Sequence, residues 1–250
     1  MAESLRGKVA LVTGGAGGFG AAMGRRLAAR GAQVVLADVH EEGAAAVAEE
    51  IGGAAVRCDV SSLEDNLAAV AFAVERFGGL DIVALNAGVS TGFGIEDDFD
   101  VDKYRRVMGI NLDGVVFGLH AALPRLRGRG GGDVIATASL AGLTPVPMDP
   151  LYAANKAAVV HLVRSLGPVL GDSGIRVNAL CPSFAHTPII TPIREALEGM
   201  RTPILPVDAV MDAFERILDS GQSGQAWFVQ YGRPSEPFGF RGVPGPRVEQ

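Results

Sequence analysis

Short apolar runs alternate with longer amphipathic stretches along almost the whole chain. The apolar runs are rich in valine, isoleucine, leucine and alanine, which is typical of strands buried on both faces. The stretches between them have helical periodicity. The predicted strands are Val9–Thr13, Gln33–Asp38, Ala55–Asp59, Ile82–Asn86, Asp133–Ser139, Arg176–Cys181 and Ala226–Gln230. The predicted helices include Ala21–Arg30, Ser62–Phe77, Val101–Arg127 and Leu151–Leu170.

This regular alternation predicts an α/β fold. Seven strands separated by helices form a parallel sheet that is covered by helices on both faces, the doubly wound, Rossmann-like arrangement. No internal repeat and no shift in composition indicates a second domain. We therefore expect one domain over residues 1–231.

Two segments interrupt the pattern. Ser183–Pro206 contains four prolines, which limit helix length, and it follows the carboxyl end of a predicted strand. A loop in that place lies over the ligand crevice of an open α/β sheet, so we expect it to act as a lid. The tail, residues 232–250, is rich in proline and glycine and is predicted to lack regular structure, frayed or lying across a neighbouring subunit.

Charge and composition argue against several classes of protein. The net charge is -6, which disfavours nucleic acid and anionic membranes as partners. No segment reaches the roughly 18 uninterrupted apolar residues of a membrane span, and the polar start from Met1 to Lys8 is unlike a signal peptide. The two cysteines, Cys58 and Cys181, and the four histidines lack metal-ligand spacing. We expect a cytoplasmic protein whose chemistry needs no metal.

A glycine-rich loop joins the first strand to the first helix. It reads Thr13-Gly14-Gly15-Ala16-Gly17-Gly18-Phe19-Gly20. Glycines allow a tight turn and a close approach to a pyrophosphate, and the helix that follows presents free N–H groups to the phosphates. A flexible turn is the alternative, but the position between a strand and a helix favours dinucleotide binding.

An acidic residue, Asp38, ends the second predicted strand. A carboxylate there accepts hydrogen bonds from the adenosine ribose hydroxyls and repels a 2′-phosphate, which favours NAD over NADP. A solvated aspartate at the end of a strand is the alternative. The nearby glycine loop favours the interpretation that Asp38 binds the cofactor.

Tyr152 and Lys156 are four residues apart on a predicted helix, so their side chains share one face. An ammonium group near a phenol favours the phenolate and lowers the pKa of the tyrosine towards neutrality. Such a pair is able to move a proton to or from an alcohol oxygen.

Taken together, these motifs resemble those of the short-chain dehydrogenase/reductase family from Lys8 to about Gln230. The shared features, in order, are Thr13-Gly14-x-x-x-Gly18-x-Gly20, Asn86-Ala87-Gly88, Asn111, Ser139 and Tyr152-x-x-x-Lys156. The resemblance implies that Tyr152 is the acid/base and that Lys156 binds the nicotinamide ribose. It also implies that Ser139 holds the substrate oxygen and that Asn111 holds a water linking the lysine to solvent.

The resemblance also implies a set of cofactor contacts. Asp59-Val60 correspond to the adenine-contacting pair, Asn86-Ala87-Gly88 to the cofactor wall, and Pro182 and Thr187 to positions near the nicotinamide carboxamide. The full expected NAD site is Gly14, Gly17, Gly18, Phe19, Gly20, Asp38, Val39, Asp59, Val60, Asn86, Ala87, Gly88, Tyr152, Lys156, Pro182 and Thr187. The chain departs from the family at Leu85, where asparagine is frequent, and at Ser183, where glycine is common.

The expected substrate is an apolar secondary alcohol or its ketone. The residues expected to surround it are mostly apolar: Phe93, Leu140, Ala141, Leu143, Pro145, Val146, Met148, Phe184, Ile189 and Ile190. A 3-oxoacyl thioester reductase is the alternative enzyme, but its usual preference for NADP conflicts with Asp38. A non-catalytic nucleotide-binding regulator is an alternative from another class, against which the intact Ser139, Tyr152 and Lys156 argue. A structural interaction protein is a further alternative, which would leave the intact glycine loop unexplained.

A homo-oligomer is expected, a tetramer or else a dimer. Two predicted helices carry apolar residues over more of their circumference than one sheet face covers. These residues are Val115, Val116, Phe117, Leu119, Val159, Val160, Leu162 and Val163.

Overall fold

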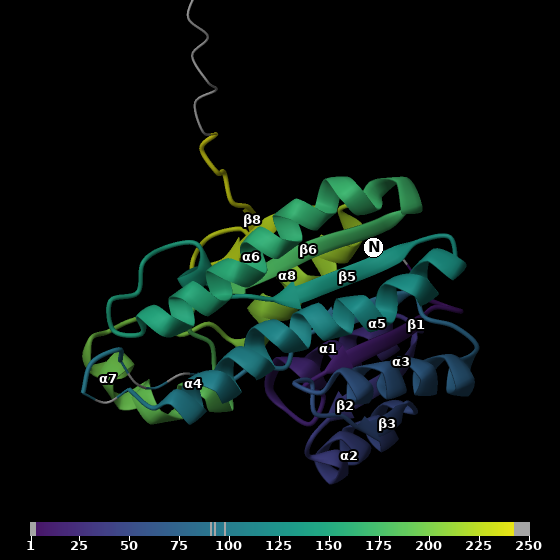
Figure 1. The fold of residues 1–250 in the computed structure, drawn as a ribbon, viewed down its shortest axis with the longest axis horizontal. Helices are drawn as coiled ribbons and strands as arrows, with labels where there is room; N and C mark the ends of the chain where they lie inside the picture. Colours follow the sequence, from purple (N-terminus) through teal and green to yellow (C-terminus); the bar gives the residue numbers. More distant parts are fainter. Residues whose placement is uncertain (1–3, 91, 93, 98, 243–250) are drawn as a thin grey trace, which may run out of the picture.

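The chain folds around one sheet whose strand order is β3-β2-β1-β4-β5-β6-β7-β8 (Figure 1). The structure is a computed structural model that describes residues 4–90, 92, 94–97 and 99–242. The strands are β1 Val9–Thr13, β2 Gln33–Asp38, β3 Ala54–Arg57, β4 Ile82–Leu85, β5 Gly132–Thr137, β6 Ile175–Pro182, β7 Ala226–Val229 and β8 Glu236–Pro237. Strands β1 to β7 pair in parallel, as the sequence predicts. The order reverses between β1 and β4, so the carboxyl ends of these two strands define the crevice where ligands bind in such sheets.

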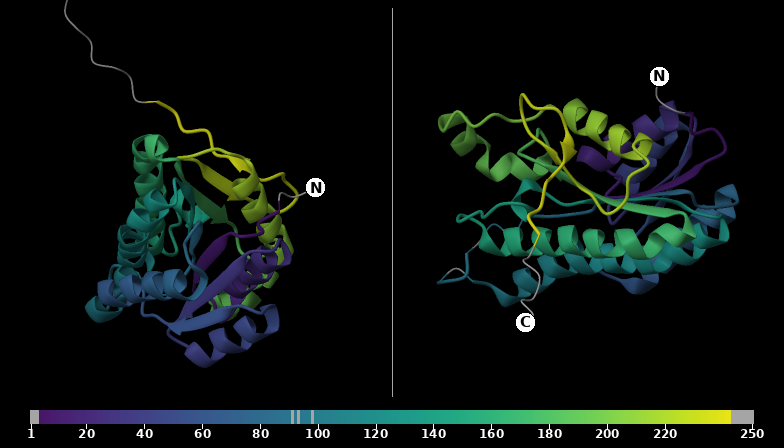
Figure 2. Two further views of the ribbon diagram at one scale, coloured as in Figure 1. Left: turned by 90° about the vertical axis from the view of Figure 1, so that its right-hand side faces the viewer. Right: turned by 90° about the horizontal axis from the view of Figure 1, so that it is seen from above.

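Helices cover both faces of the sheet (Figure 2). They are α1 Gly18–Ala29, α2 Glu41–Ile51, α3 Leu63–Phe77, α4 Val101–Met108, α5 Gly114–Gly128, α6 Pro150–Leu170, α7 Arg194–Gly199 and α8 Val207–Asp219. Helices α1, α2 and α8 pack on one face, in a core that includes Met23, Leu36 and Phe214. Helices α3, α5 and α6 pack on the other face, around Leu119, Val159 and Val177. The doubly wound α/β prediction is confirmed.

The sheet has eight strands, one more than predicted. Strand β8 pairs antiparallel with β7, Trp227 opposite Pro237 and Phe228 opposite Glu236. The prediction that the tail is irregular is therefore wrong at this point, because the exposed edge of β7 offers hydrogen bonds that local composition does not reveal. Beyond β8, the centre of the Phe240 ring lies 3.5 Å from the Arg164 guanidinium on α6. Residues 243–250 lie outside the described residues.

The predicted helix Val101–Arg127 is divided by a π-helical turn, η1, over Gly109–Asp113. There the Gly114 N–H donates to the Gly109 carbonyl, one residue further back than in an α-helix. The whole helical stretch, residues 101–128, is long and apolar enough to cross a bilayer by length and composition alone. Its apolar character is explained by packing, since Leu119, Ala122 and Leu126 are buried against the sheet.

Most of the residues that suggested an oligomer lie in the core of the subunit. Val115, Leu119, Val159, Val160 and Val163 are buried, so their apolar character needs no partner. Val116 remains 41% exposed on the outer side of α5. Five of the eight residues therefore give no indication of a subunit contact.

The expected lid, residues 183–206, contains two short helical turns, η4 Pro188–Ile193 and α7. Its two ends are joined: Ala185 and Leu205 form a β-bridge, and the Leu205 N–H donates to the Phe184 carbonyl at 2.8 Å. Between these ends, Ile193 and Met200 are exposed. Helix α7 and the start of α4 lie at the same end of the molecule (Figure 1).

Candidate active site

The carboxyl ends of β1, β4 and β5 are tied together by side chains. The Thr13 hydroxyl accepts hydrogen bonds from the backbone N–H groups of Asn86 and Ala87, at 2.9 and 3.1 Å. The Asn86 amide donates to the Thr13 carbonyl at 3.1 Å and accepts from the Thr137 hydroxyl at 3.1 Å. The segment Asn86-Ala87-Gly88, the predicted crevice wall, is therefore held in place at the carboxyl ends of these strands.

The glycine loop requires glycine for two different reasons. Gly14 and Gly18 have φ values of +69° and +53°, in the left-handed region that favours glycine. A side chain at Gly20 would overlap the carbonyl oxygen of Gly14. These constraints turn the chain sharply from β1 into α1.

The start of α1 is suited to a phosphate group. No side chain caps this helix end, and a Cβ added at Gly17 would meet nothing within 4 Å. Uncapped N–H groups and the positive end of the helix dipole attract anions. Thr187 and Pro188 lie against Gly18, 3.8 Å from a Cβ placed there, so the lid begins beside the loop. The Phe19 side chain packs into the core on the α1 face.

Asp38 lies at the end of β2, next to the glycine loop. Its carboxylate accepts hydrogen bonds from the backbone N–H groups of Ala16, at 3.0 Å, and His40, at 2.9 Å. Each carboxylate oxygen has a further lone pair for a ribose hydroxyl. The neighbouring Val39 is 59% exposed, open to an adenosine group.

Asp59 and Val60 are less open than the sequence suggests. The Asp59 carboxylate accepts from the Ser61 hydroxyl at 2.6 Å and from the Ser61 N–H at 3.0 Å. These hydrogen bonds, above all that from the Ser61 hydroxyl, lower the pKa of Asp59. The Val60 side chain is buried against Gly114 of α5. A contact with an adenine ring would therefore involve backbone atoms rather than the Val60 side chain.

Three side chains from two elements meet above the sheet: Ser139, which follows β5, and Tyr152 and Lys156 on α6. The Lys156 ammonium is buried, donates to the Thr137 carbonyl at 2.9 Å, and lies 5.7 Å from the centre of the Tyr152 ring. The Ser139 hydroxyl lies close enough to the Tyr152 phenol to favour its ionised form. The Lys156 ammonium can donate two more hydrogen bonds, and it borders Gly88 of the crevice wall. Ribose hydroxyls between this wall and α6 would satisfy them.

The pKa values at this site differ from the sequence expectation. Burial raises the pKa of Tyr152 to about 12, although the nearby Ser139 hydroxyl lowers it. Burial also lowers the pKa of Lys156 to about 8. The prediction of a lowered phenol pKa is wrong for this structure, because the loss of hydration on burial outweighs the interaction with Ser139 that favours the phenolate.

Asn111 lies in the π-helical turn and is completely buried. Its side-chain amide accepts from the Val89 N–H at 2.8 Å and donates to the Val89 carbonyl at 2.9 Å. The amide therefore anchors the chain just after the crevice wall. Its oxygen also lies near Gly88, 3.3 Å from a Cβ placed there, on the same side as Lys156.

The expected substrate residues fall into different environments. Leu140, Ala141 and Leu143 are half-buried around the turn after Ser139, whereas Met148 is 84% exposed and Ile190 is buried in the core. Phe93 lies outside the described residues. Sequence reasoning missed Thr137, whose carbonyl holds Lys156; every residue has a carbonyl, so no sequence signal identifies it. It also missed Asn155, buried beside Lys156, whose amide donates to the Met108 sulfur.

Comparison with known proteins agrees with the fold and the motifs. The family model described as short chain dehydrogenase matches residues 8–198. The 2,5-dichloro-2,5-cyclohexadiene-1,4-diol dehydrogenase LinX of Sphingobium indicum is 36% identical over 220 residues, 86% of this chain and 88% of LinX. The 3-alpha-(or 20-beta)-hydroxysteroid dehydrogenase of Mycobacterium tuberculosis is 40% identical over 191 residues, 76% of this chain and 73% of that protein.

A comparison of structures gives the same family. The 3-ketoacyl-(acyl-carrier-protein) reductase of Brucella melitensis, in a crystal structure described as a complex with NADH, superposes with a TM-score of 0.84 at 32% identity. The match covers 92% of this chain and 99% of that one. This chain belongs to the short-chain dehydrogenase family, and it is an oxidoreductase.

Proposed function

We propose that this protein is an NAD(H)-dependent dehydrogenase that interconverts an apolar cyclic secondary alcohol and its ketone. The observation that carries the proposal is that Ser139, Tyr152 and Lys156 meet above the carboxyl ends of the strands, on the same side of the sheet as the uncapped start of α1 and the Asp38 carboxylate. The two dehydrogenases compared above are named for cyclic alcohols. The half-buried apolar turn Leu140–Gly142 beside Ser139 supports an apolar substrate.

NAD supplies the hydride acceptor when it is bound, and NADH supplies the donor in the reverse direction. The glycine loop and the start of α1 hold the phosphates, while Asp38 accepts from the adenosine ribose. Lys156 holds the nicotinamide ribose through its free donors. Pro182 and Thr187, where the lid leaves β6, lie at the nicotinamide end of the crevice.

Proton movement is assigned to Tyr152. In ketone reduction, the phenol donates its proton to the substrate oxygen, which Ser139 orients by a hydrogen bond. In alcohol oxidation, the Tyr152 oxygen takes the proton from the substrate hydroxyl. Because burial raises the phenol pKa to about 12, the residue is protonated at neutral pH and ready for reduction. Oxidation requires the phenolate, so its rate rises as the pH becomes more alkaline.

A 3-oxoacyl thioester reductase is the second candidate. It is supported by the Brucella melitensis reductase, whose structure is described with NADH rather than NADPH. A preference for NAD therefore does not separate the two candidates. The substrate does, because a carrier-bound thioester needs a long open channel, whereas a cyclic alcohol needs a closed apolar pocket.

The test is a substrate panel with the purified protein and NAD, followed by the absorbance of reduced nicotinamide. The panel contains cyclohexanol, a cyclic diol, a hydroxysteroid, a linear secondary alcohol and a 3-hydroxyacyl thioester. We expect the cyclic alcohols to be oxidised fastest, with Tyr152→Phe as the inactive control. A preference for the thioester would favour the second candidate. No turnover with any member, in a protein that binds NAD, would refute both candidates in favour of a regulator.

We also propose that the protein is a homo-oligomer, a tetramer or a dimer, through the outer side of α5 that carries Val116. Light scattering at micromolar concentration tests this, and a monomer of 25.9 kDa is the contrary result.

A further inference from the structure

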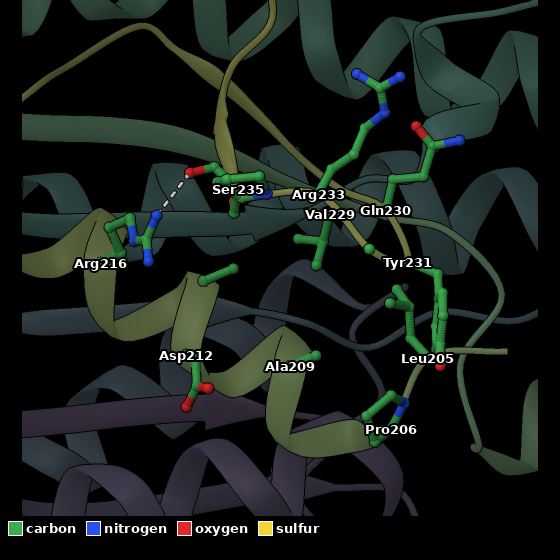
Figure 3. Close-up of a pocket in the computed structure, with 13 residues that line it drawn as sticks. Leu205, Pro206, Ala209, Asp212, Arg216, Val229, Gln230, Tyr231, Arg233 and Ser235 are labelled. Atoms are coloured by element: carbon green, nitrogen blue, oxygen red, sulfur yellow. Dashed lines mark hydrogen bonds between the residues drawn. The ribbon is translucent and has the colours of Figure 1, made fainter. Parts of the chain in front are cut away.

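A second cavity lies on the α8 face of the molecule, outside the catalytic crevice (Figure 3). It has a volume of about 470 Å³, is open to solvent, and lies between α8 on one side and the loop from Gln230 to Ser235 on the other. This size falls within the range of roughly 300–1,000 Å³ that is typical of small-molecule sites. Its floor is apolar and buried: Leu205, Ala213 and Val229 are 2–4% exposed.

Small side chains keep this space open. Ala209, Asp212, Ala213 and Arg216 occupy one face of α8, at the spacing of neighbours on a helix. The two alanines lie opposite the loop and leave room between it and the helix. Pro234 restricts the loop backbone, and Gly232 supplies the left-handed turn, with φ of +71°, that the loop needs. The cavity is therefore a feature of both elements and not of one side-chain rotamer.

The polar groups of the cavity favour an anion. Arg216 donates one hydrogen bond, to the Ser235 carbonyl at 3.1 Å, and forms no ion pair with any residue that the structure describes. The nearby Asp212 carboxylate already pairs with Arg26 at 3.2 Å. The Ser235 hydroxyl is buried without a partner in the described part of the chain, and the Ser235 residue is 9% exposed. Unused guanidinium donors and a free hydroxyl above an apolar floor complement a carboxylate with an apolar body.

Both ends of the lid are bonded to the floor of this cavity. The Ser183 N–H donates to the Val229 carbonyl at 2.9 Å, and the His186 N–H donates to the Leu205 carbonyl at 3.0 Å. Pro182, opposite Val229 in the sheet, accepts from the Ser139 hydroxyl at 3.4 Å. A ligand that presses on Leu205 and Val229 thus contacts the residues that anchor the lid.

We propose that this cavity is a second binding site for a small monocarboxylate with an apolar body, held by Arg216, and that its occupation restrains the lid. The site is independent of the substrate assignment, because none of its residues is among the expected catalytic or NAD-binding residues, although Leu205 and Pro206 belong to the end of the lid.

The chain carries its own probe for binding, a single tryptophan. Trp227 is two residues before Val229 on β7, so both side chains point to the same face of the sheet, and both belong to the α8-side core. We expect hexanoate to change the Trp227 fluorescence in a saturable way in the full-length protein. Hexanamide, which has the same apolar body without the charge, should bind at least about tenfold more weakly.

Three variants locate the effect. Arg216→Gln should weaken hexanoate binding at least about tenfold, and Ala209→Leu should remove it by filling the cavity. Arg233→Gln is the matched control, because Arg233 also lines the cavity but its guanidinium extends away from α8 and from Arg216 (Figure 3), and this variant should bind hexanoate as the wild type does. Equal binding by the wild type and Arg216→Gln would overturn the proposal, and so would the absence of a saturable change in the wild type.

The link to the lid has a separate readout. Arg194 and Arg201 are exposed on the lid and are sites for trypsin. Hexanoate should slow their cleavage at least threefold in the wild type and leave it unchanged in Arg216→Gln. Binding without protection would refute the restraint of the lid.

Discussion

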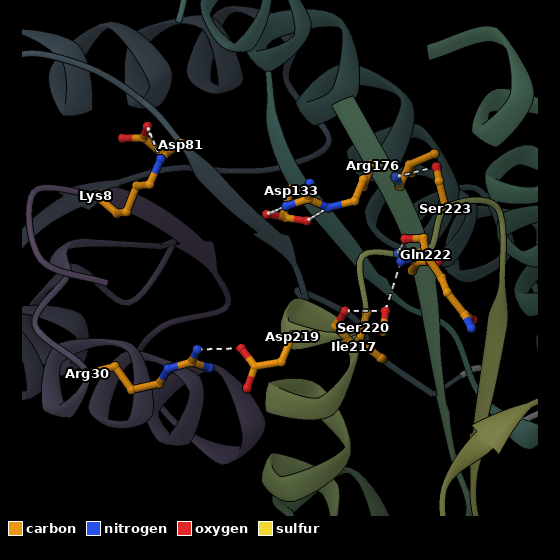
Figure 4. A network of polar contacts seen from close by, with 12 residues as sticks. Lys8, Arg30, Asp81, Asp133, Arg176, Ile217, Asp219, Ser220, Gln222 and Ser223 are labelled. Atoms are coloured by element: carbon orange, nitrogen blue, oxygen red, sulfur yellow. Dashed lines mark hydrogen bonds and ion pairs between the residues drawn. The ribbon is translucent and has the colours of Figure 1, made fainter. Parts of the chain in front are cut away.

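Buried charges are treated differently at the two ends of the parallel strands. At the amino-terminal edge of the sheet, where the strands begin, buried carboxylates pair with guanidinium groups. At the carboxyl-terminal edge, where the strands end, the buried ammonium of Lys156 donates to a backbone carbonyl. The Asp133 carboxylate accepts two hydrogen bonds from Arg176, one from Nε and one from Nη2, each at 2.7 Å (Figure 4). Asp81 accepts from the Val9 N–H and pairs with Lys8 and Arg129. Opposite charges at this edge offset the loss of hydration, although burial still raises the pKa of Asp133.

The carboxyl-terminal edge leaves its charge uncompensated. Lys156 forms no ion pair with any residue that the structure describes, and its pKa falls to about 8 because burial disfavours the ammonium. The difference separates two uses of buried charge: pairing at one edge supports the fold, and unpaired donors at the other edge are kept for a ligand. Substitutions at the two edges should therefore affect different properties of the protein.

The largest effect is expected for the proton-transferring group. Tyr152→Phe should lower kcat about 100- to 10,000-fold, because it removes the general acid/base. NAD binding should stay close to that of the wild type, since the affinity comes mainly from the glycine loop and Asp38. Steady-state kinetics and a fluorescence titration with NADH measure the two quantities. Retention of a tenth of the activity would remove Tyr152 from its assigned role.

Cofactor choice is the next largest effect at the same edge. Asp38 should make NAD at least about 100-fold better than NADP in kcat/KM, through two hydrogen bonds to ribose hydroxyls and repulsion of a 2′-phosphate. Asp38→Ala should shrink this preference, mostly by weakening NAD use. Because the carboxylate also holds the N–H groups of Ala16 and His40, the variant should lose some affinity for both cofactors. Equal use of the two cofactors by the wild type would contradict the assignment.

At the amino-terminal edge, Arg176→Met should lower the free energy of unfolding by about 2 to 3 kcal/mol. It leaves the Asp133 carboxylate, 15% exposed, without its partner, and Arg176 itself is partly exposed, which moderates the cost. The loss should diminish as the pH falls, because protonation of Asp133 removes the buried charge. Urea unfolding at pH 7 and pH 5 measures this. The control measurement is kcat, which should be unchanged. A large fall in kcat would contradict the view that this ion pair supports the fold and not catalysis.

The smallest effect has the opposite sign. The Lys156 pKa is lowered from its ordinary 10.5 to about 8, which corresponds to about 3 kcal/mol of unfavourable burial below pH 8. Lys156→Met removes this cost and loses one hydrogen bond, to Thr137, so the cofactor-free protein should gain about 2 kcal/mol.

The sign follows from proton binding. The folded state holds fewer protons on Lys156 than the unfolded state between pH 8 and 10.5, so the wild type recovers stability as the pH rises through this window. The advantage of Lys156→Met should therefore be greatest below pH 8 and small near pH 10.5. A variant less stable than the wild type at pH 7 would mean that Lys156 supports the fold.

Local patterns were sufficient for the cofactor side of the crevice. The glycine loop, the end of β2 at Asp38 and the four-residue spacing of Tyr152 and Lys156 depend on backbone geometry over a few residues. Strands β1 and β2 have the predicted bounds, and the other predicted strands differ by one or two residues. The parallel order also follows from sequence, because alternating strands and helices have few ways to pack.

What the sequence by itself determined, then, is the fold, the family and the residues that meet at the crevice. Only the tertiary structure decided that β8 covers the edge of β7, that Val159 and Val163 belong to the core, and that the Tyr152 phenol has a raised pKa. Each of these depends on what lies across a face or an edge from residues distant in the sequence. Periodicity shows that a side chain is apolar or shares a helix face, but burial and hydration are set by all the elements packed around it.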